Sequence, residues 1–165
     1  TVQLSRGDLV DPLKALEMGQ PGDVIVVDAG GDLNTSVCGG LMGGLAQNRG
    51  IRAMIVDGAG RDTDELEDIN WPIWTRAITP RGTHTMFSGR KEELSINVPI
   101  ACGGVVVNPG DFIVADLMGV VVIPQELAEE TVRLAQEQAD REEETRKWVA
   151  KGKTVEDLLN EFGRI

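Results

Sequence analysis

Two glycine-rich segments, joined by one helical pattern and one apolar run, constrain this chain more than any other feature of its sequence. The first spans residues 39–44 and the second spans residues 57–62, which end in Arg61 and Asp62. Between them, residues 53–56 read Ala-Met-Ile-Val, a pattern that predicts a buried strand. This order lets main-chain amides of the first segment meet side chains of the second. We therefore expect the two segments to form one cradle for a small anion.

The residue types in this cradle indicate which ligand it holds. A helix that begins near Gly40 exposes its first amides, and the positive end of its dipole favours a carboxylate or a phosphate. Arg61 presents a planar fork that matches a carboxylate. Asp62 offers a hard oxygen ligand for Mg²⁺ or Mn²⁺, and Glu65, three residues on, shares its helical face. The pattern predicts a site for a metal and a carboxylate.

A plainer interpretation of the same residues stays open. Glycine pairs also occur in ordinary tight turns, and Arg61 with Asp62 can form a helix cap and a surface ion pair. The glycine-rich segments contain no Gly-Lys-Ser/Thr triplet and no Gly-x-Gly-x-x-Gly between strand and helix. The sequence therefore argues against a phosphate-binding P-loop and against a dinucleotide-binding fold.

Composition excludes several other classes of protein. The 165 residues include 16 Lys and Arg against 27 Asp and Glu, a net charge of −11 that repels a nucleic-acid backbone. Cys38 and Cys102 are not in a CxxC pair, which argues against a zinc site and a disulfide framework. No apolar run reaches the ~18 residues of a membrane span, and no signal peptide is evident. We expect a soluble, cytoplasmic protein without membrane or direct nucleic-acid partners.

Periodicity along the rest of the chain predicts an α/β protein. Two Pro-Gly-Asp turns, at Pro21 and Pro109, each precede a β-branched run, which favours a layered sheet or a small barrel. The single histidine, His84, lies in a polar loop. Helices are expected over residues 9–18 and 37–48; strands over 24–28, 53–56, 72–79, 112–116 and 120–123; and a loop over 29–34 with Asp28 and Asp32 as turn caps or carboxylates behind the site.

The C-terminal part has a different pattern. A long helix is expected from Gln125 to about Lys151, and its segment 140–147 is polar on every side. Thr154 with Asp157 predicts the cap of a last helix. We predict two parts, a domain over residues 1–124 and a helical extension over residues 125–165, which is either solvated or packed against a neighbouring subunit.

Several motifs together resemble a known family. Gly40, twenty intervening residues and then Arg61-Asp62-x-x-Glu65 is similar to the motif of RraA-like proteins, which share a fold with metal-dependent 4-hydroxy-4-methyl-2-oxoglutarate aldolases. Further similar blocks are PGDVIVVD at residues 21–28, TPRG at 79–82, INVP at 96–99 and GGVVVNPGD at 103–111. The resemblance covers roughly residues 7–124 and implies a layered β/β/α swivelling-type domain followed by the helical extension.

The resemblance also implies roles for individual residues. A pyruvate-like carboxylate would be held at Gly39, Gly40, Leu41 and Met42, largely by backbone amides, with Arg61 on the substrate's oxygens. Asp62 would hold the metal, Mg²⁺ or Mn²⁺. The resemblance also implies one difference: confirmed aldolases of this group look to have an acidic residue at the position where this chain has Gly40. For aldol cleavage, Glu65 or a glutamate from a neighbour's tail would then have to act as the base that takes the proton of the C4 hydroxyl.

These roles point to a lyase that acts on 2-oxo acids and releases pyruvate, either as an aldolase or as an oxaloacetate decarboxylase. Decarboxylation needs no base for a hydroxyl proton, so it tolerates glycine at position 40 better than aldol cleavage does. The resemblance further implies a homotrimer or homohexamer with its site at a subunit interface, which one of Glu137, Glu142, Glu143 and Glu144 would reach from the neighbouring tail. The alternative is a non-catalytic RraA-like regulator that binds and inhibits a ribonuclease.

Overall fold

The computed structural model describes residues 1–4, 8–83 and 93–164. It divides into two compact units, Thr1–Pro124 and Gln125–Ile165. The predicted loop residue His84 lies outside the described residues.

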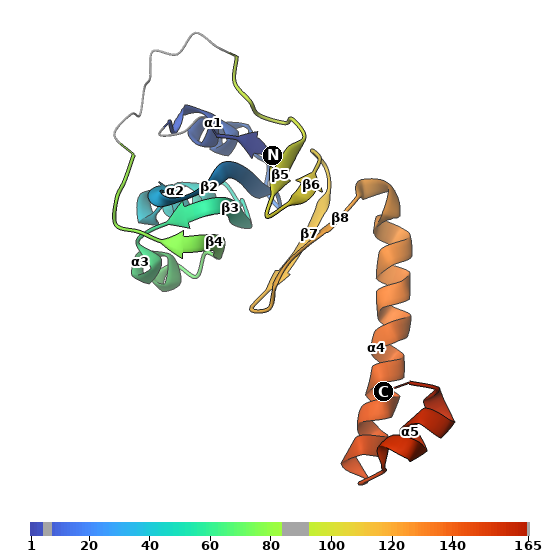
Figure 1. The fold of residues 1–165 in the computed structure, drawn as a ribbon. Coiled ribbons are helices and arrows are strands. Elements are labelled where there is room, and N and C mark those ends of the chain that lie inside the picture. Colours follow the sequence, from blue (N-terminus) through green and yellow to red (C-terminus); the bar gives the residue numbers. More distant parts are fainter. Residues whose placement is uncertain (5–7, 84–92, 165) are drawn as a thin grey trace. The chain divides into compact units, whose positions relative to one another are not determined.

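The first unit is built on a parallel sheet of four strands in the order β1-β2-β3-β4 (Figure 1). Parallel neighbours need crossover connections, and α1 (Val10–Met18), α2 (Gly40–Asn48) and α3 (Thr63–Asp68) lie in these connections. The strands are β1 (Val2–Gln3), β2 (Val24–Cys38), β3 (Ala53–Gly60) and β4 (Ile73–Ile78).

Two antiparallel hairpins complete this unit. The first pairs β5 (Ile100–Cys102) with β6 (Val105–Val107), and the second pairs β7 (Phe112–Asp116) with β8 (Gly119–Ile123). The Pro-Gly-Asp turn at residues 109–111 precedes β7, as its pattern predicted.

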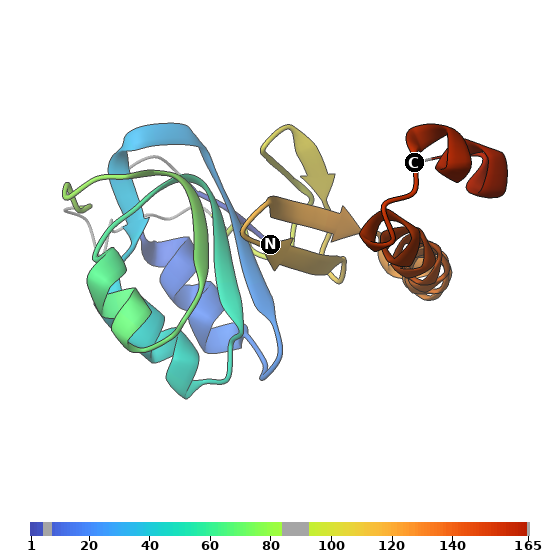
Figure 2. The same ribbon diagram turned by 90° about the horizontal axis from the view of Figure 1, so that it is seen from below.

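The parallel sheet has apolar side chains on both faces because successive residues of a strand point to opposite sides. On one face, Val27 and Met54 pack with Leu16 of α1 and Ala46 of α2. On the other face, Val26 and Ile55 pack with Ile100 and Val107 of the first hairpin, and Ile113 and Val122 of the second join them. Helices therefore cover one face of the sheet and hairpins cover the other (Figure 2). The predicted layered α/β class is confirmed.

Three expected boundaries are wrong, and all for the same reason. β2 continues to Cys38 through the expected loop at residues 29–34, α2 begins at Gly40 rather than at Val37, and residues 57–60 belong to β3 rather than to a turn. The cause is the pairing of Ser36 with Ala59 and of Cys38 with Gly60, which extends both strands across register shifts. A Cβ on Gly58 would lie 2.8 Å from the Cβ of Ala29, so this glycine permits the close approach.

The second unit is helical. A short 3₁₀ turn (Gln125–Leu127) leads into α4 (Ala128–Ala150), and α5 (Val155–Phe162) follows. The predicted cap is present, because the Thr154 hydroxyl accepts from the Asp157 amide at 3.2 Å and the Asp157 carboxylate accepts from the Thr154 amide at 2.9 Å. Phe162 meets Trp148 edge to face at 5.4 Å between ring centroids. None of the described helices is long and apolar enough to cross a membrane.

Candidate functional site

The two glycine-rich segments meet where β2 and β3 end. Cys38, the last residue of β2, pairs with Gly60, the last residue of β3, and its carbonyl accepts the Arg61 amide at 2.9 Å. The chain then enters α2 from one strand and α3 from the other. The parallel register of β2 and β3 therefore brings the start of α2 beside Arg61 and Asp62, as the order of the sequence elements predicted.

Asp62 lies at the N-terminus of α2, although it belongs to the start of α3. Its Oδ2 accepts the Gly40 amide at 3.2 Å and Arg61 Nε at 3.2 Å. Its backbone is left-handed (φ 52°, ψ 45°), which is uncommon for a residue with a side chain and turns the carboxylate toward α2. A negative group thus occupies the anion-binding end of α2.

This contact corrects one feature of the expected cradle. The sequence predicted that the cradle between the two segments holds a small anion, whereas the carboxylate of Asp62 itself binds the Gly40 amide. A substrate carboxylate at Gly40 would have to displace it.

Arg61 is fixed by groups that the sequence analysis did not identify. Its Nη1 donates to the hydroxyl of Ser36 at 2.9 Å, and Ser36 is fully buried at the end of β2. A Cβ on Gly82 would lie 2.8 Å from Nη1, so this glycine also makes room for the guanidinium. No local signal marks Ser36, which follows Asn34 and Thr35 in the sequence. Its contact with Arg61 follows from strand pairing across 25 residues of sequence.

Gly39 and Gly40 are required by the charged side chains beside them. A Cβ on Gly39 would overlap Asp62 Oδ2 and lie 2.8 Å from Arg61 Cγ. A Cβ on Gly40 would overlap Glu65 Oε2 and lie 2.9 Å from the Cβ of Glu65. The carboxylate of Glu65 therefore occupies the space over Gly40 that a side chain at position 40 would need.

The predicted role of Leu41 and Met42 rests on their backbone amides rather than on their side chains. The Leu41 side chain is 86% exposed, while Met42 is buried in the core. The first amide-to-carbonyl bond within α2 joins Gly43 to Gly39 at 3.0 Å, so the amides of Leu41 and Met42 precede the regular helical ladder. They are donors of the first helical turn, which is where an anion binds.

The remaining candidates have structural roles. Asp28 Oδ1 accepts the Gly30 amide at 2.8 Å, and Asp32 Oδ1 accepts the Asn34 amide at 2.9 Å, so both carboxylates cap local turns. Burial raises the pKa of the Cys38 thiol to about 12, despite the opposing effect of nearby Arg61. Cys38 is therefore a neutral thiol at physiological pH and is no nucleophile.

Comparison with known proteins gives the family. The RraA-like family model, described as Aldolase/RraA, matches residues 1–122. This chain belongs to the RraA-like family. A protein of Halalkalibacterium halodurans, provisionally named a 4-hydroxy-4-methyl-2-oxoglutarate aldolase, is 43% identical over 143 residues, which cover 86% of this chain and 66% of that relative.

Solved structures agree with this assignment. An uncharacterised protein from Pseudomonas syringae aligns with a TM-score of 0.77 at 28% identity, covering 94% of this chain and 73% of its own. The RNA-processing inhibitor RraA from Thermus thermophilus aligns with a TM-score of 0.66 at 33% identity, over 75% of this chain and 72% of its own. The family thus includes proteins named as aldolases and a protein named as an inhibitor.

Proposed function

We propose that this chain is a divalent-metal-dependent lyase that releases pyruvate from a 2-oxo acid, with oxaloacetate as the favoured substrate. The observation that carries the proposal is the arrangement of Arg61 and Asp62 against the N-terminus of α2, with Glu65 beside them. A guanidinium, an anion-binding helix end and a carboxylate that can hold a metal are groups suited to such a reaction.

The side chains of this site suit a Mg²⁺ or Mn²⁺ ion that keeps several of its bound waters. Among residues 1–4, 8–83 and 93–164, no group of three or more His, Cys, Asp or Glu side chains gathers to hold a metal. Mg²⁺ keeps several of its waters and commonly binds one or two carboxylates together with the substrate. Asp62 would hold the ion, which when bound polarises the 2-oxo group as a Lewis acid.

Arg61 and the amides of α2 would orient the substrate. The amides of Gly40, Leu41 and Met42 would bind its C1 carboxylate once Asp62 leaves Gly40. Arg61, fixed by Ser36, would face the 2-oxo oxygen. When the C3–C4 bond of oxaloacetate breaks, its electron pair forms the enolate, CO₂ leaves, and the enolate oxygen gains negative charge that the guanidinium stabilises. Protonation at C3 then yields pyruvate.

Aldol cleavage of 4-hydroxy-4-methyl-2-oxoglutarate needs one more group. A base must take the C4 hydroxyl proton as the C3–C4 bond breaks, which gives one pyruvate and one pyruvate enolate. The carboxylate of Glu65 lies over Gly40 and would serve, directly or through a water. We expect this reaction to be slower than decarboxylation, because it needs this additional proton transfer.

The test is release of pyruvate from each substrate, measured with lactate dehydrogenase and NADH, with Mg²⁺ and with EDTA. We expect metal-dependent turnover of oxaloacetate by the wild type and none by Asp62→Ala. The matched control is Asp64→Ala, which removes a nearby exposed carboxylate from α3 and should keep the activity. Because Mg²⁺ alone accelerates decarboxylation of oxaloacetate, each rate is compared with protein-free buffer. Wild-type rates equal to that buffer would overturn the proposal.

The second candidate is a non-catalytic regulator that binds and inhibits a ribonuclease. Two observations favour it: the similarity to the RNA-processing inhibitor RraA of Thermus thermophilus and the absence of a side chain at Gly40. The discriminating variant is Gly40→Asp combined with Glu65→Gly, because Glu65 otherwise occupies the space. No turnover by the wild type, together with turnover by this double variant, would favour the regulator.

A further inference from the structure

A cavity of about 310 Å³ lies between the parallel sheet and the two hairpins of the first unit. The sheet contributes Val26, Ile55 and Trp74 to its wall, and the hairpins contribute further branched aliphatic side chains. Arg61, Asp62 and Glu65 are not among the residues that line it. The cavity is therefore separate from the candidate catalytic site.

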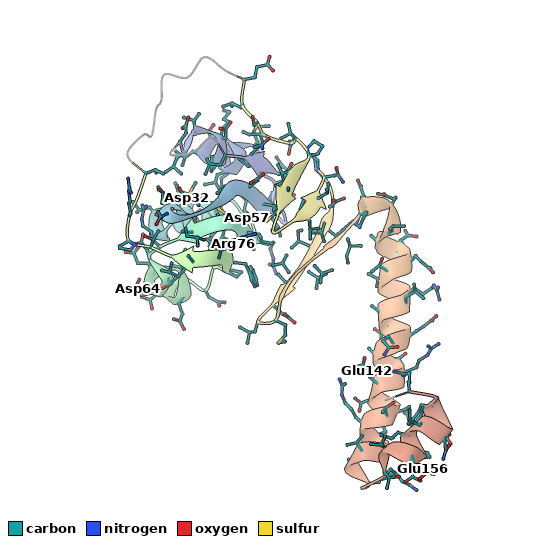
Figure 3. All side chains as sticks on the ribbon, viewed as in Figure 1. Asp32, Asp57, Asp64, Arg76, Glu142 and Glu156 are labelled. Atoms are coloured by element: carbon teal, nitrogen blue, oxygen red, sulfur yellow. The ribbon has the colours of Figure 1, made fainter. Side chains whose placement is uncertain are left out.

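One end of the cavity carries a charged pair. Val26, Ile55 and Trp74 are register partners on three neighbouring strands, and Asp57 and Arg76 follow two residues later on the same face. Arg76 Nε forms an ion pair with Asp57 Oδ1, and Figure 3 shows the two side chains meeting between β3 and β4. Strand register thus places one arginine at the polar end of an apolar cavity.

The two members of this pair differ in what they can still bind. Asp57 is 8% exposed, and its Oδ2 accepts the Gly103 amide of the first hairpin at 2.8 Å, so its charge is used inside the protein. The Arg76 side chain is 51% exposed. Within the described chain, its ion pair uses Nε, so the edge formed by Nη1 and Nη2 remains for a second acceptor. That edge can bind a carboxylate through two parallel hydrogen bonds.

We propose that this cavity binds a small apolar carboxylic acid, with its carboxylate on Arg76 and its hydrocarbon part against the valines and Trp74. The volume is near the lower limit of ligand pockets, about 300 Å³, which favours a short branched acid over a larger ligand. Asp57 acts as a positioning residue, because it holds Nε and leaves Nη1 and Nη2 for the ligand. This proposal does not depend on the lyase function.

The test uses the whole chain and 4-methylpentanoate as the probe, with calorimetry for affinity and the Trp74 indole N–H signal in NMR spectra for location. That indole donates to the Asp116 carbonyl at 2.8 Å, so its signal reports on the wall of the cavity. We expect the acid to shift this signal and to bind at least tenfold more tightly than 4-methylpentan-1-ol or 3-methylbutylamine. Equal affinity for the acid and the alcohol would overturn the proposal.

Two variants test whether the acid binds in this cavity or elsewhere on the protein. Arg76→Gln should lower the affinity at least tenfold, with Arg52→Gln, an exposed arginine outside the cavity, as its matched control. Because Arg76→Gln also leaves buried Asp57 without its cation, Val120→Phe serves as a second variant. Val120 is 36% exposed and lines the cavity, so a phenylalanine there fills the space and spares the ion pair.

Val120→Phe should therefore abolish binding of 4-methylpentanoate while the protein stays folded, as judged by its far-ultraviolet circular dichroism. Asp62→Ala should leave the affinity for this acid unchanged, and pyruvate with Mg²⁺ should not compete. Binding that survives Val120→Phe, or that Asp62→Ala or pyruvate removes, would show that the acid binds elsewhere and would overturn the proposal.

Discussion

Arg61 in the first unit and Arg133 in the second show how differently the two units use charge. Arg61 donates to the buried Ser36 hydroxyl and to Asp62, whose carboxylate also binds a backbone amide. Arg133 pairs with Glu130 at 2.6 Å and with Glu137 at 2.5 Å, all on the surface of one helix. Its side chain is 53% exposed against 32% for Arg61.

The number of ion pairs is therefore a poor guide to the role of a charged residue. Arg133 has the shorter contacts, but they join neighbours three and four residues apart along α4, where any helix with this spacing would form them. Arg61 instead reaches Ser36 of β2, and its neighbour Asp62 reaches Gly40 of α2, so these two contacts exist only in the folded unit. A charge held by contacts from several elements has a fixed position in the folded protein.

The largest effect should come from removing the guanidinium itself. Arg61→Ala should lower metal-dependent pyruvate release by about 10²–10³-fold, the usual cost of losing one donor to a developing oxyanion. Arg133→Ala provides the matched control and should keep wild-type activity. Steady-state kinetics on oxaloacetate measure both. Equal losses in the two variants would break the comparison.

The next-largest effect should be a loss of stability when a side chain is placed in the space over Gly40. Gly40→Asp should destabilise the fold by about 1–3 kcal/mol, as overpacking commonly does, since its side chain would overlap the carboxylate of Glu65. Chemical denaturation followed by circular dichroism measures the free energy of unfolding. Adding Glu65→Gly should recover part of the loss. A Gly40→Asp variant as stable as the wild type would show that Glu65 moves away at no cost.

Ser36→Ala should have a smaller effect than Arg61→Ala, because Ser36 acts through Arg61 and does not touch the substrate. Loss of its hydrogen bond, typically about 1 kcal/mol, predicts roughly a fivefold to tenfold lower kcat/KM. Ser36→Thr, which keeps the hydroxyl, should restore most of the activity. If both variants lose activity to the same degree, packing at this buried position matters rather than the hydrogen bond.

The smallest effect should be in the second unit. Glu137→Gln removes one partner of Arg133 and leaves the other, Glu130, in place. Exposed pairs of this kind contribute little to stability because solvent and salt screen them. We expect no measurable change in melting temperature at 0.15 M salt. A clear drop would show that α4 is covered in solution, for example by another subunit, which would sharpen the predicted role of the tail in an oligomer.

The sequence predicted contacts between residues close together in the chain better than contacts between residues far apart in it. The cap at Thr154 and Asp157 needs three residues of spacing and was predicted correctly. The start of α2 was placed three residues early, because Val37 and Cys38 fit a helix pattern equally well and only pairing with β3 makes them a strand. The role of Ser36 was not foreseen, since nothing local marks it as the partner of an arginine 25 residues away.

The sequence alone determined which chemical groups are available and the order in which they come: glycines before a helix, then Arg61, Asp62 and Glu65 after a strand, and an acidic helical extension. Tertiary structure alone decided that Asp62 binds the Gly40 amide, that Glu65 fills the space over Gly40, and that Asp57 meets Arg76 beside an apolar cavity. The physical reason is that these pairs are set by strand register and by side-chain packing, which depend on contacts between segments far apart in the chain.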